Sequence, residues 1–107
     1  CQSMVQLFMN VVELGMDVQQ AIEAPRASPW SFPNSFWPHD YHPGMVGVEG
    51  RIGPQTVAEL QRRGHQVQVW DDFVPRQGCL CAIQVDQQRG SLSAGSDPRR
   101  DGYAIGR

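Results

Sequence analysis

The first segment of the chain is apolar at most positions and carries one narrow polar stripe. Gln6, Asn10, Glu13 and Asp17 recur at steps of four, three and four, the spacing of one face of an α-helix. The pattern predicts a helix over residues 2–14, ended by Gly15 in a left-handed conformation. The remaining sides are apolar, so we expect this helix to be buried on most sides: Met4, Val5, Leu7, Phe8, Met9, Val11, Val12 and Leu14.

A second, short helix is predicted to begin at Asp17. The Asp17 carboxylate suits the free N–H groups of a first turn, and Gln20 stands where a capping box places its second member. Pro25 cannot donate a helical hydrogen bond and restricts the residue before it, so the helix must end there.

Residues 28–44 combine proline and aromatic residues without a period of two or 3.6. This composition predicts an ordered loop that separates two regular parts of the chain.

Beyond this loop the pattern alternates between strands and one helix. Residues 45–49 form a plausible strand, and Pro54 suits the first turn of a helix that runs to about Arg63 and ends at Gly64. Val67 and Val69 alternate with glutamines, as in a half-buried strand.

The last part of the chain predicts a hairpin. Residues 79–85 alternate and residues 86–90 form a turn that returns the chain into residues 91–95, followed by an extended tail over 96–107. We expect Cys79, Cys81, Ile83 and Val85 on the inward face. Residues 1–107 thus form one segment of α+β class, with helices on an antiparallel sheet.

Composition excludes several classes of partner. The net charge is −2, and the basic cluster Arg99 and Arg100 lies between Asp97 and Asp101, so nucleic acid is an unsuitable partner. No stretch approaches the roughly 18 apolar residues of a membrane span. We therefore expect a soluble chain with no membrane partner. The sequence shows no secretory leader, and the compartment, periplasmic or cytoplasmic, stays open.

The cysteines offer one candidate for nucleophilic chemistry. Cys79 or Cys81 could act with His65 as thiolate and base, but the inward strand face favours small apolar core residues instead. A disulfide between them is disfavoured, because residues two apart on a strand are poorly spaced for the bond. The nucleophile elbow, the zinc-protease motif and the Gly-rich phosphate loops are all absent.

Three further clusters each have two interpretations. His39, Asp40 and His42 could hold a divalent metal with one more ligand, although exposed loop residues are favoured. The aromatic residues of the loop could form a binding surface, but a plug that covers the sheet or helices is favoured. A third cluster, of charged residues near the end of the sequence, could bind an anion or form a salt-bridged surface turn. The aromatic set is Trp30, Phe32, Phe36, Trp37 and Tyr41, and the third cluster is Asp97, Pro98, Arg99, Arg100 and Asp101.

Taken together, three blocks of the chain resemble the closing part of the small subunit in the gamma-glutamyltranspeptidase family. They occur in the family's order and span nearly the whole chain. The first block is Gln6, Asn10 and Val11 with Gly15-Met16-Asp17 and the run from Gln20 to Arg26; the second is Pro54-Gln55-Thr56-Val57, Leu60, Arg63-Gly64-His65 and Val67; the third is Gly95 to Gly102 with Ala104 and Gly106. The loop over residues 28–44 matches no signature of the family.

The resemblance implies an Ntn-hydrolase fold, a four-layer αββα sandwich, of which this chain is the C-terminal segment. It implies a parent enzyme that cuts itself to free a threonine, which moves a gamma-glutamyl group from glutathione-like amides to water or an amino acid through an acyl-enzyme. In the family the threonine, the substrate-gripping residues and the oxyanion-hole glycines all precede the first helix. No catalytic, substrate-binding or metal residue and no cofactor is therefore assigned to this chain.

The implied partner is the remainder of the parent enzyme, its large subunit and the N-terminal part of its small subunit. The isolated chain is expected to be inactive and to form a homodimer through the helix of residues 4–14. Two alternatives stay open: a related amidase or acylase that acts on cephalosporin side chains or poly-gamma-glutamate, and a non-enzymatic interaction module.

Overall fold

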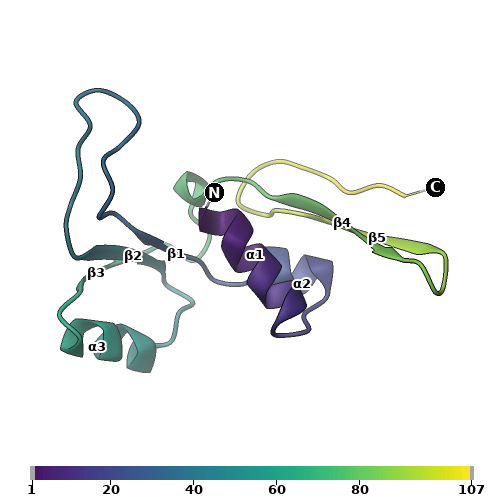
Figure 1. Ribbon diagram of the computed structural model, residues 1–107, viewed down its shortest axis with the longest axis horizontal. Coiled ribbons are helices and arrows are strands. Elements are labelled where there is room, and N and C mark those ends of the chain that lie inside the picture. Colours follow the sequence, from purple (N-terminus) through teal and green to yellow (C-terminus); the bar gives the residue numbers. More distant parts are fainter. Residues whose placement is uncertain (1, 107) are drawn as a thin grey trace. The chain divides into compact units, whose positions relative to one another are not determined.

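The computed structural model describes residues 2–106, and these form two compact units of mixed helix and sheet (Figure 1). Unit 1 comprises residues 2–24 together with 75–106, and unit 2 comprises residues 25–74. The α+β class predicted from the sequence is confirmed, but the prediction of a wholly antiparallel sheet is wrong, because residues 45–49 and 66–70 pair in parallel. In the described residues, no helix has the length and apolar character to cross a membrane.

Unit 1 begins with two helices, and both predicted helix ends are confirmed. Helix α1 spans Gln2–Val12, and Gly15 beyond it has a positive φ of 66°. Helix α2 spans Val18–Glu23 and ends before Pro25. Its capping box forms as predicted, since Gln20 N donates to Asp17 Oδ1 at 2.8 Å and Asp17 N donates to Gln20 Oε1 at 3.4 Å.

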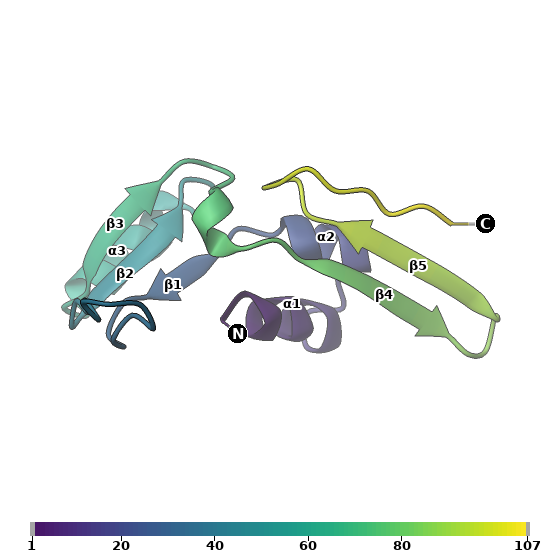
Figure 2. The same ribbon diagram turned by 90° about the horizontal axis from the view of Figure 1, so that it is seen from above.

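The predicted hairpin is also present in unit 1, preceded by a 3₁₀ turn, η1, over Pro75–Gln77. Strands β4 (Cys81–Asp86) and β5 (Ser91–Ser96) pair antiparallel, with Ile83 opposite Ala94 (Figure 2). Helix α2 packs on this hairpin. The side chain of Ile22 lies so close to Gly95 that a Cβ there would come within 2.8 Å of it, which explains a glycine at this point of β5.

The predicted orientation of β4 is wrong. The core of unit 1 consists of Val18, Ile22 and Leu80, with Leu7 and Ala82 packed against it. The inward side of this segment is therefore the face of Leu80 and Ala82. Because successive strand residues point to opposite faces, Cys81, Ile83 and Val85 lie on the other side and are exposed.

Within this chain, helix α1 is not buried on most sides. None of its described residues is buried, although Leu7 and Val11 are partly covered, and Met4, Val5, Phe8, Met9 and Val12 are exposed. Asn10, from the polar stripe, is also partly covered and donates to Ala21 O of α2 at 3.4 Å. Within this chain only one side of the apolar surface of α1 is therefore covered.

Unit 2 is a three-stranded mixed sheet with one helix. Strand β2 (Met45–Glu49) pairs in parallel with β3 (Gln66–Trp70), and helix α3 (Pro54–Arg62) connects them. Pro54 lies in the first turn of α3, and Gly64 after the helix has a positive φ of 91°, both as predicted. Val69, expected to be half-buried, is 55% exposed.

The segment predicted as a loop begins with a short strand that the sequence pattern does not predict. Strand β1 (Ala27–Pro29) pairs antiparallel with β2, with Ser28 opposite Gly47. Pro29 fits here because β1 is at the edge of the sheet, where a missing N–H is tolerated. The loop proper therefore starts at Trp30.

Candidate functional site

Two members of the charged cluster near the end of the chain, Asp97 and Arg99, are buried in unit 1. Asp97 and Arg99 form an ion pair in which Nη1 and Oδ1 are 3.1 Å apart, and the exposed fraction of both side chains is 0%. The predicted salt bridge is therefore confirmed for these two residues, but the prediction that they lie at the surface is wrong. The local sequence does not predict this burial, because the two carbonyl groups that accept hydrogen bonds from Arg99 lie at the end of α2, 75 and 77 positions away.

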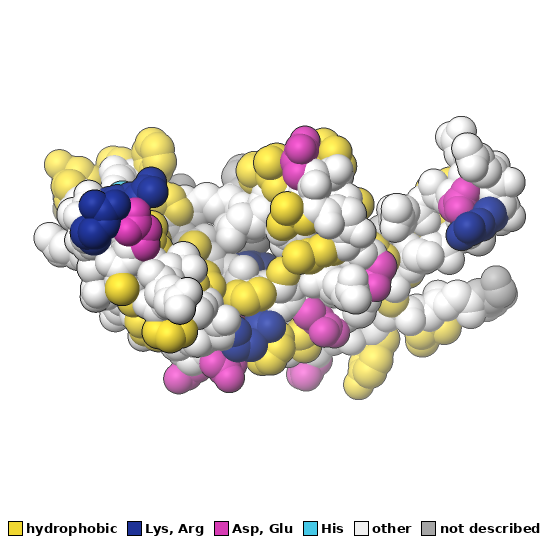
Figure 3. Space-filling view, turned by 90° about the horizontal axis from the view of Figure 1, so that it is seen from below, with side chains coloured by type: hydrophobic (Ala, Val, Ile, Leu, Met, Phe, Trp, Pro, Cys, Tyr) yellow, Lys and Arg dark blue, Asp and Glu magenta, His cyan; other side chains and the backbone are white. Residues whose placement is uncertain are grey.

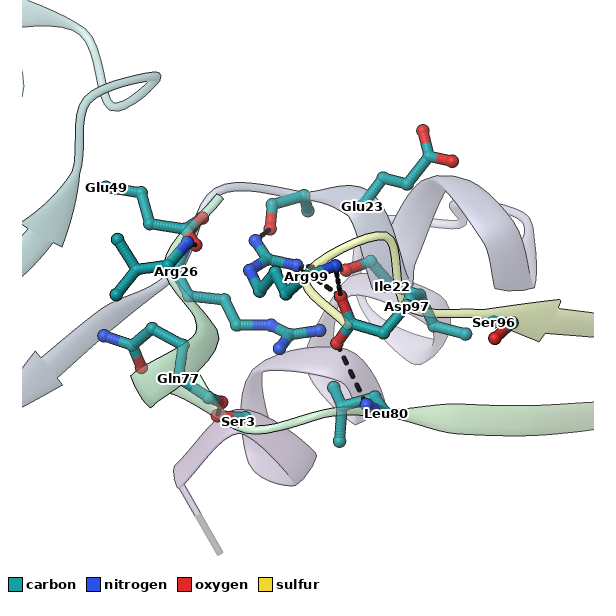
Figure 4. Close-up of polar contacts among 12 residues, drawn as sticks. Ser3, Ile22, Glu23, Arg26, Glu49, Gln77, Leu80, Ser96, Asp97 and Arg99 are labelled. Carbon is teal, nitrogen blue, oxygen red and sulfur yellow. Dashed lines mark hydrogen bonds and ion pairs between the residues drawn. The ribbon is translucent and has the colours of Figure 1, made fainter. Parts of the chain in front are cut away.

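This ion pair connects three segments of unit 1 (Figure 4). Asp97 Oδ2 accepts a hydrogen bond from Leu80 N at 2.9 Å, just before β4. Arg99 Nη1 donates to Ile22 O at 3.0 Å, and Nη2 donates to Ala24 O at 3.0 Å. These contacts give the guanidinium acceptors from the chain itself, so the structure supports a structural clamp rather than an anion site.

Two polar side chains reinforce the same region. Gln19 of α2 both donates to Ser96 O at 3.1 Å and accepts from Ser96 N at 3.0 Å, so it pairs with the end of β5 like a neighbouring strand. Ser3 Oγ of α1 donates to Gln77 O at 2.6 Å. Both helices are thus attached by polar contacts to the segments that lead into and out of the hairpin.

A second buried carboxylate, Glu49, organises unit 2. Its exposed fraction is 0%, and Oε2 accepts from Arg26 N at 3.0 Å while Oε1 accepts from Val74 N at 3.1 Å. Arg51 Nη2 lies 3.3 Å from Oε2 and supplies a positive partner. The sequence motifs do not predict this role for Glu49. The available signal was an acidic residue that ends an otherwise apolar strand and is followed by glycine.

The histidines of the loop do not form a metal centre in the described part of the chain. No group of three or more His, Cys, Asp or Glu side chains there is arranged to hold a metal ion. His39 Nδ1 instead lies 2.8 Å from Asn34 O, and the His42 ring lies 5.9 Å from the Trp30 ring.

The aromatic residues of the loop divide into two groups. Trp30 packs edge-on against Trp70 of β3 with ring centroids 6.3 Å apart, as expected of a plug. The other members of the set, Phe32, Phe36, Trp37 and Tyr41, are exposed, and Trp37 has an exposed fraction of 86%. The expected plug is therefore wrong for these four residues.

The candidate thiol and base are not brought together within either unit. Cys79 and Cys81 belong to unit 1 and are exposed free thiols, whereas His65 belongs to unit 2. Desolvation raises the pKa of the Cys79 thiol, and neighbouring Cys81 and Asp97 raise it further. A raised pKa leaves less thiolate at neutral pH, which argues against a catalytic nucleophile.

Comparison with known proteins identifies the family. The family model "Gamma-glutamyltranspeptidase" matches residues 1–107. The chain belongs to the gamma-glutamyltranspeptidase family. The "Glutathione hydrolase-like YwrD proenzyme" of Bacillus subtilis (strain 168) is 37% identical over 105 residues, which cover 98% of this chain and 19% of that protein. The chain thus spans about a fifth of the length of this relative.

Solved structures agree with this assignment. The "Structure of LmbA2991T421A" is 44% identical with a TM-score of 0.89, over 99% of this chain and 19% of that one. The cephalosporin acylase from Bacillus halodurans is 31% identical with a TM-score of 0.77, over 94% of this chain and 17% of that one. A gamma-glutamyltranspeptidase from Pseudomonas nitroreducens shares the fold at 22% identity and a TM-score of 0.69, over 98% of this chain and 48% of that one. The fold is therefore that of a C-terminal segment of the Ntn-hydrolase sandwich.

Proposed function

We propose that this chain is the C-terminal structural portion of a gamma-glutamyl acyltransferase or hydrolase. The proposal is carried by the extent of the family match. The family model matches residues 1–107, and the match to the Bacillus subtilis relative covers only 19% of the length of that protein. The parent enzyme would transfer a gamma-glutamyl group from glutathione-like amides to water or an amino acid. The nucleophile would be a threonine freed by self-cleavage, outside this chain.

Exposed apolar surface in unit 1 supports a larger assembly. Met4, Phe8 and Val12 of α1 are each more than half exposed, and so are Ile83 and Leu92 on the outer face of the hairpin. Figure 3 shows hydrophobic side chains at the surface on one face of the molecule. Large exposed apolar patches mark protein interfaces. The proposed partner is the remainder of the parent enzyme, its large subunit and the rest of its small subunit.

The contribution of this chain would be positional rather than chemical. The Asp97–Arg99 pair and the Gln19 contacts fix α2 against the hairpin, and Asn10 and Ser3 attach α1 to the same frame. In the proposed parent, this frame supports the helix that follows the oxyanion-hole glycines. No residue of this chain is proposed to contact the reacting atoms or to bind substrate.

The acyl donor has a related alternative. The names of the relatives differ, one being a glutathione hydrolase-like protein and another a cephalosporin acylase. An amidase or acylase that acts on cephalosporin side chains or poly-gamma-glutamate is therefore the second candidate. The donor depends on groups of the parent that recognise the substrate's alpha-carboxylate, since buried polar groups left unpaired by the wrong substrate give strong discrimination.

A complementation assay tests the proposal. The remainder of the parent enzyme is produced without residues 1–107, and release of the aniline from a gamma-glutamyl anilide is measured with and without this chain added. We expect neither part to be active alone and the mixture, or the co-expressed pair, to recover turnover. Turnover by this chain alone would refute the proposal, and turnover of only a cephalosporin side-chain amide by the pair would favour the second candidate.

The exposed aromatic loop gives a reason to consider a non-enzymatic module as well. Phe32, Phe36 and Trp37 resemble the rigid aromatic anchors of interfaces. If the chain were such a module, it would be monomeric, unfold cooperatively and leave the activity of the remainder unchanged. The same mixing experiment therefore separates the two functions.

A further inference from the structure

The start of the C-terminal tail contains the one aspartate of the sequence that is followed by glycine. Asp101 and Gly102 are both exposed and come directly after Arg100. The proposed function gives neither residue a role. Each of the other aspartates precedes a residue that has a side chain: Asp17, Asp40, Asp71, Asp72, Asp86 and Asp97.

The structure holds the backbone as far as Arg100 and leaves the next peptide bond unrestrained. Arg100 N donates to Asp97 O at 3.5 Å, which closes the turn that contains the buried ion pair. Within residues 2–106, Asp101 and Gly102 take part in no hydrogen bond or ion pair, and the described residues beyond them belong to no helix or strand. Exposed terminal segments of this kind change conformation at little cost in free energy.

An aspartate in such a position can react with the backbone that follows it. The amide nitrogen of the next residue attacks the side-chain carboxyl carbon, one water molecule leaves, and a succinimide ring forms. Glycine favours this ring closure, because it has no side chain to shield its nitrogen and its backbone reaches conformations that other residues avoid. Water then opens the ring at one of its two carbonyl groups. One opening restores aspartate, and the other leaves the chain linked through the side chain as isoaspartate.

We propose that Asp101 is a modification site at which the chain isomerises spontaneously to isoaspartate. The water lost when the ring closes is regained when it opens, so the mass is unchanged and no oxidant, metal or cofactor takes part. The product has one additional carbon atom in the backbone before Gly102 and a free α-carboxylate, which changes the course of the tail. The reaction uses only residues of this chain, so its outcome is independent of the proposed function.

Incubation of the chain in mildly acidic buffer at body temperature, followed by trypsin digestion and liquid chromatography with mass spectrometry, tests the site. Cleavage after Arg100 releases residues 101–107, and we expect a second peak of this peptide with unchanged mass that grows with time and is methylated by an isoaspartyl methyltransferase. The other aspartates should keep their normal linkage. Asp101→Glu is the matched control, because it keeps the charge but requires a larger ring, and the second peak should be lost. The proposal is overturned if the unmodified chain gives no second peak, if Asp101→Glu retains it, or if another aspartate isomerises equally.

A faster variant separates slow chemistry from a backbone that forbids ring closure. Asp101→Asn forms the same ring with ammonia as a better leaving group, so isoaspartate should accumulate several-fold faster than in the unmodified chain. A synthetic peptide of residues 96–107 with the same substitution gives the rate without folded structure, and we expect the folded variant to react at a comparable rate. A folded Asp101→Asn chain that forms no isoaspartate while the peptide reacts would show that the structure blocks the reaction, and it would overturn the proposal.

Discussion

Asp97 accepts hydrogen bonds from the backbone N–H of Leu80 and from the backbone and side chain of Arg99, while Arg99 itself donates to the carbonyls of Ile22 and Ala24. The pair therefore joins the segment just before β4 to the C-terminal end of α2. The last carbonyl groups of a helix have no hydrogen-bond partner within the helix, and Arg99 supplies donors to them here. Both side chains are fully buried. Ion pairs of this kind matter less for their own attraction than for the cost of breaking them.

Replacing one member of the pair should strongly destabilise the chain. Arg99→Met removes the buried guanidinium that pairs with the Asp97 carboxylate, together with the donors to Ile22 O and Ala24 O, so the free energy of unfolding should fall by about 3–5 kcal/mol. Urea denaturation followed by circular dichroism measures the change. Arg100→Met is the control, because exposed Arg100 has only a 3.3 Å bond to Pro75 O and its loss should cost at most about 0.5 kcal/mol. Equal effects of the two substitutions would show that burial of the pair is unimportant.

Replacing the buried Glu49 should destabilise unit 2, as replacing Arg99 destabilises unit 1. Glu49→Gln removes the negative charge opposite Arg51 and turns an amide NH₂ toward one of the two backbone donors, Arg26 N or Val74 N. A buried donor left without a partner costs about 1–3 kcal/mol, and we expect a loss in this range. The measurement is the same urea titration, with Glu59→Gln as the matched control on the exposed surface of α3. A Glu49→Gln chain as stable as this control would contradict the role assigned to Glu49.

The sequence predicts well those features of the fold that depend on residues close together along the chain. The capping box of Asp17 and Gln20, the end of α2 before Pro25, the first turn of α3 at Pro54 and the antiparallel hairpin all depend on residues within a few positions of one another. The family was also predictable, because three motif blocks lie in a fixed order.

What the sequence does not predict depends on distant residues. Glu49 acquires its role from backbone donors 23 and 25 positions away. The burial of Arg99 depends on carbonyls of α2, 75 and 77 positions away. The face of β4 was misassigned because both faces carry small or apolar residues, so only the packing of Val18 and Ile22 decides that Leu80 and Ala82 point inward.

The exposed ion pairs of α3 predict a modest dependence on pH. Hydrogen bonds from Arg62, and next from Arg63, hold the pKa of Glu59 below its usual value. A carboxyl whose pKa is lowered in the folded state adds stability at pH values above its unfolded pKa, and this contribution is lost as the pH falls through the folded pKa. The effect should be small and reduced by salt, since all three side chains are exposed.

NMR titration of the Glu59 carboxyl carbon measures this effect directly. In the unmodified chain the midpoint should lie below that of an unperturbed glutamate, and in the Arg62→Gln, Arg63→Gln double variant it should return toward the ordinary value. A Glu59 midpoint that does not move in the double variant would show that the two arginines do not cause the shift.

The exposed apolar side of α1 predicts self-association when the chain is isolated. A second copy is the available cover for Phe8 and Val12, which are 62% and 56% exposed. Burial of each such side chain contributes about 1.5–3 kcal/mol. Replacing both by glutamine should therefore weaken a dimer by more than tenfold, since each factor of ten in Kd corresponds to about 1.4 kcal/mol.

Sedimentation equilibrium over a range of concentrations measures Kd. Val69→Gln, which alters a 55% exposed valine in β3, is the control and should leave Kd unchanged. A monomeric unmodified chain, or equal weakening by Val69→Gln, would mean that α1 does not form the interface.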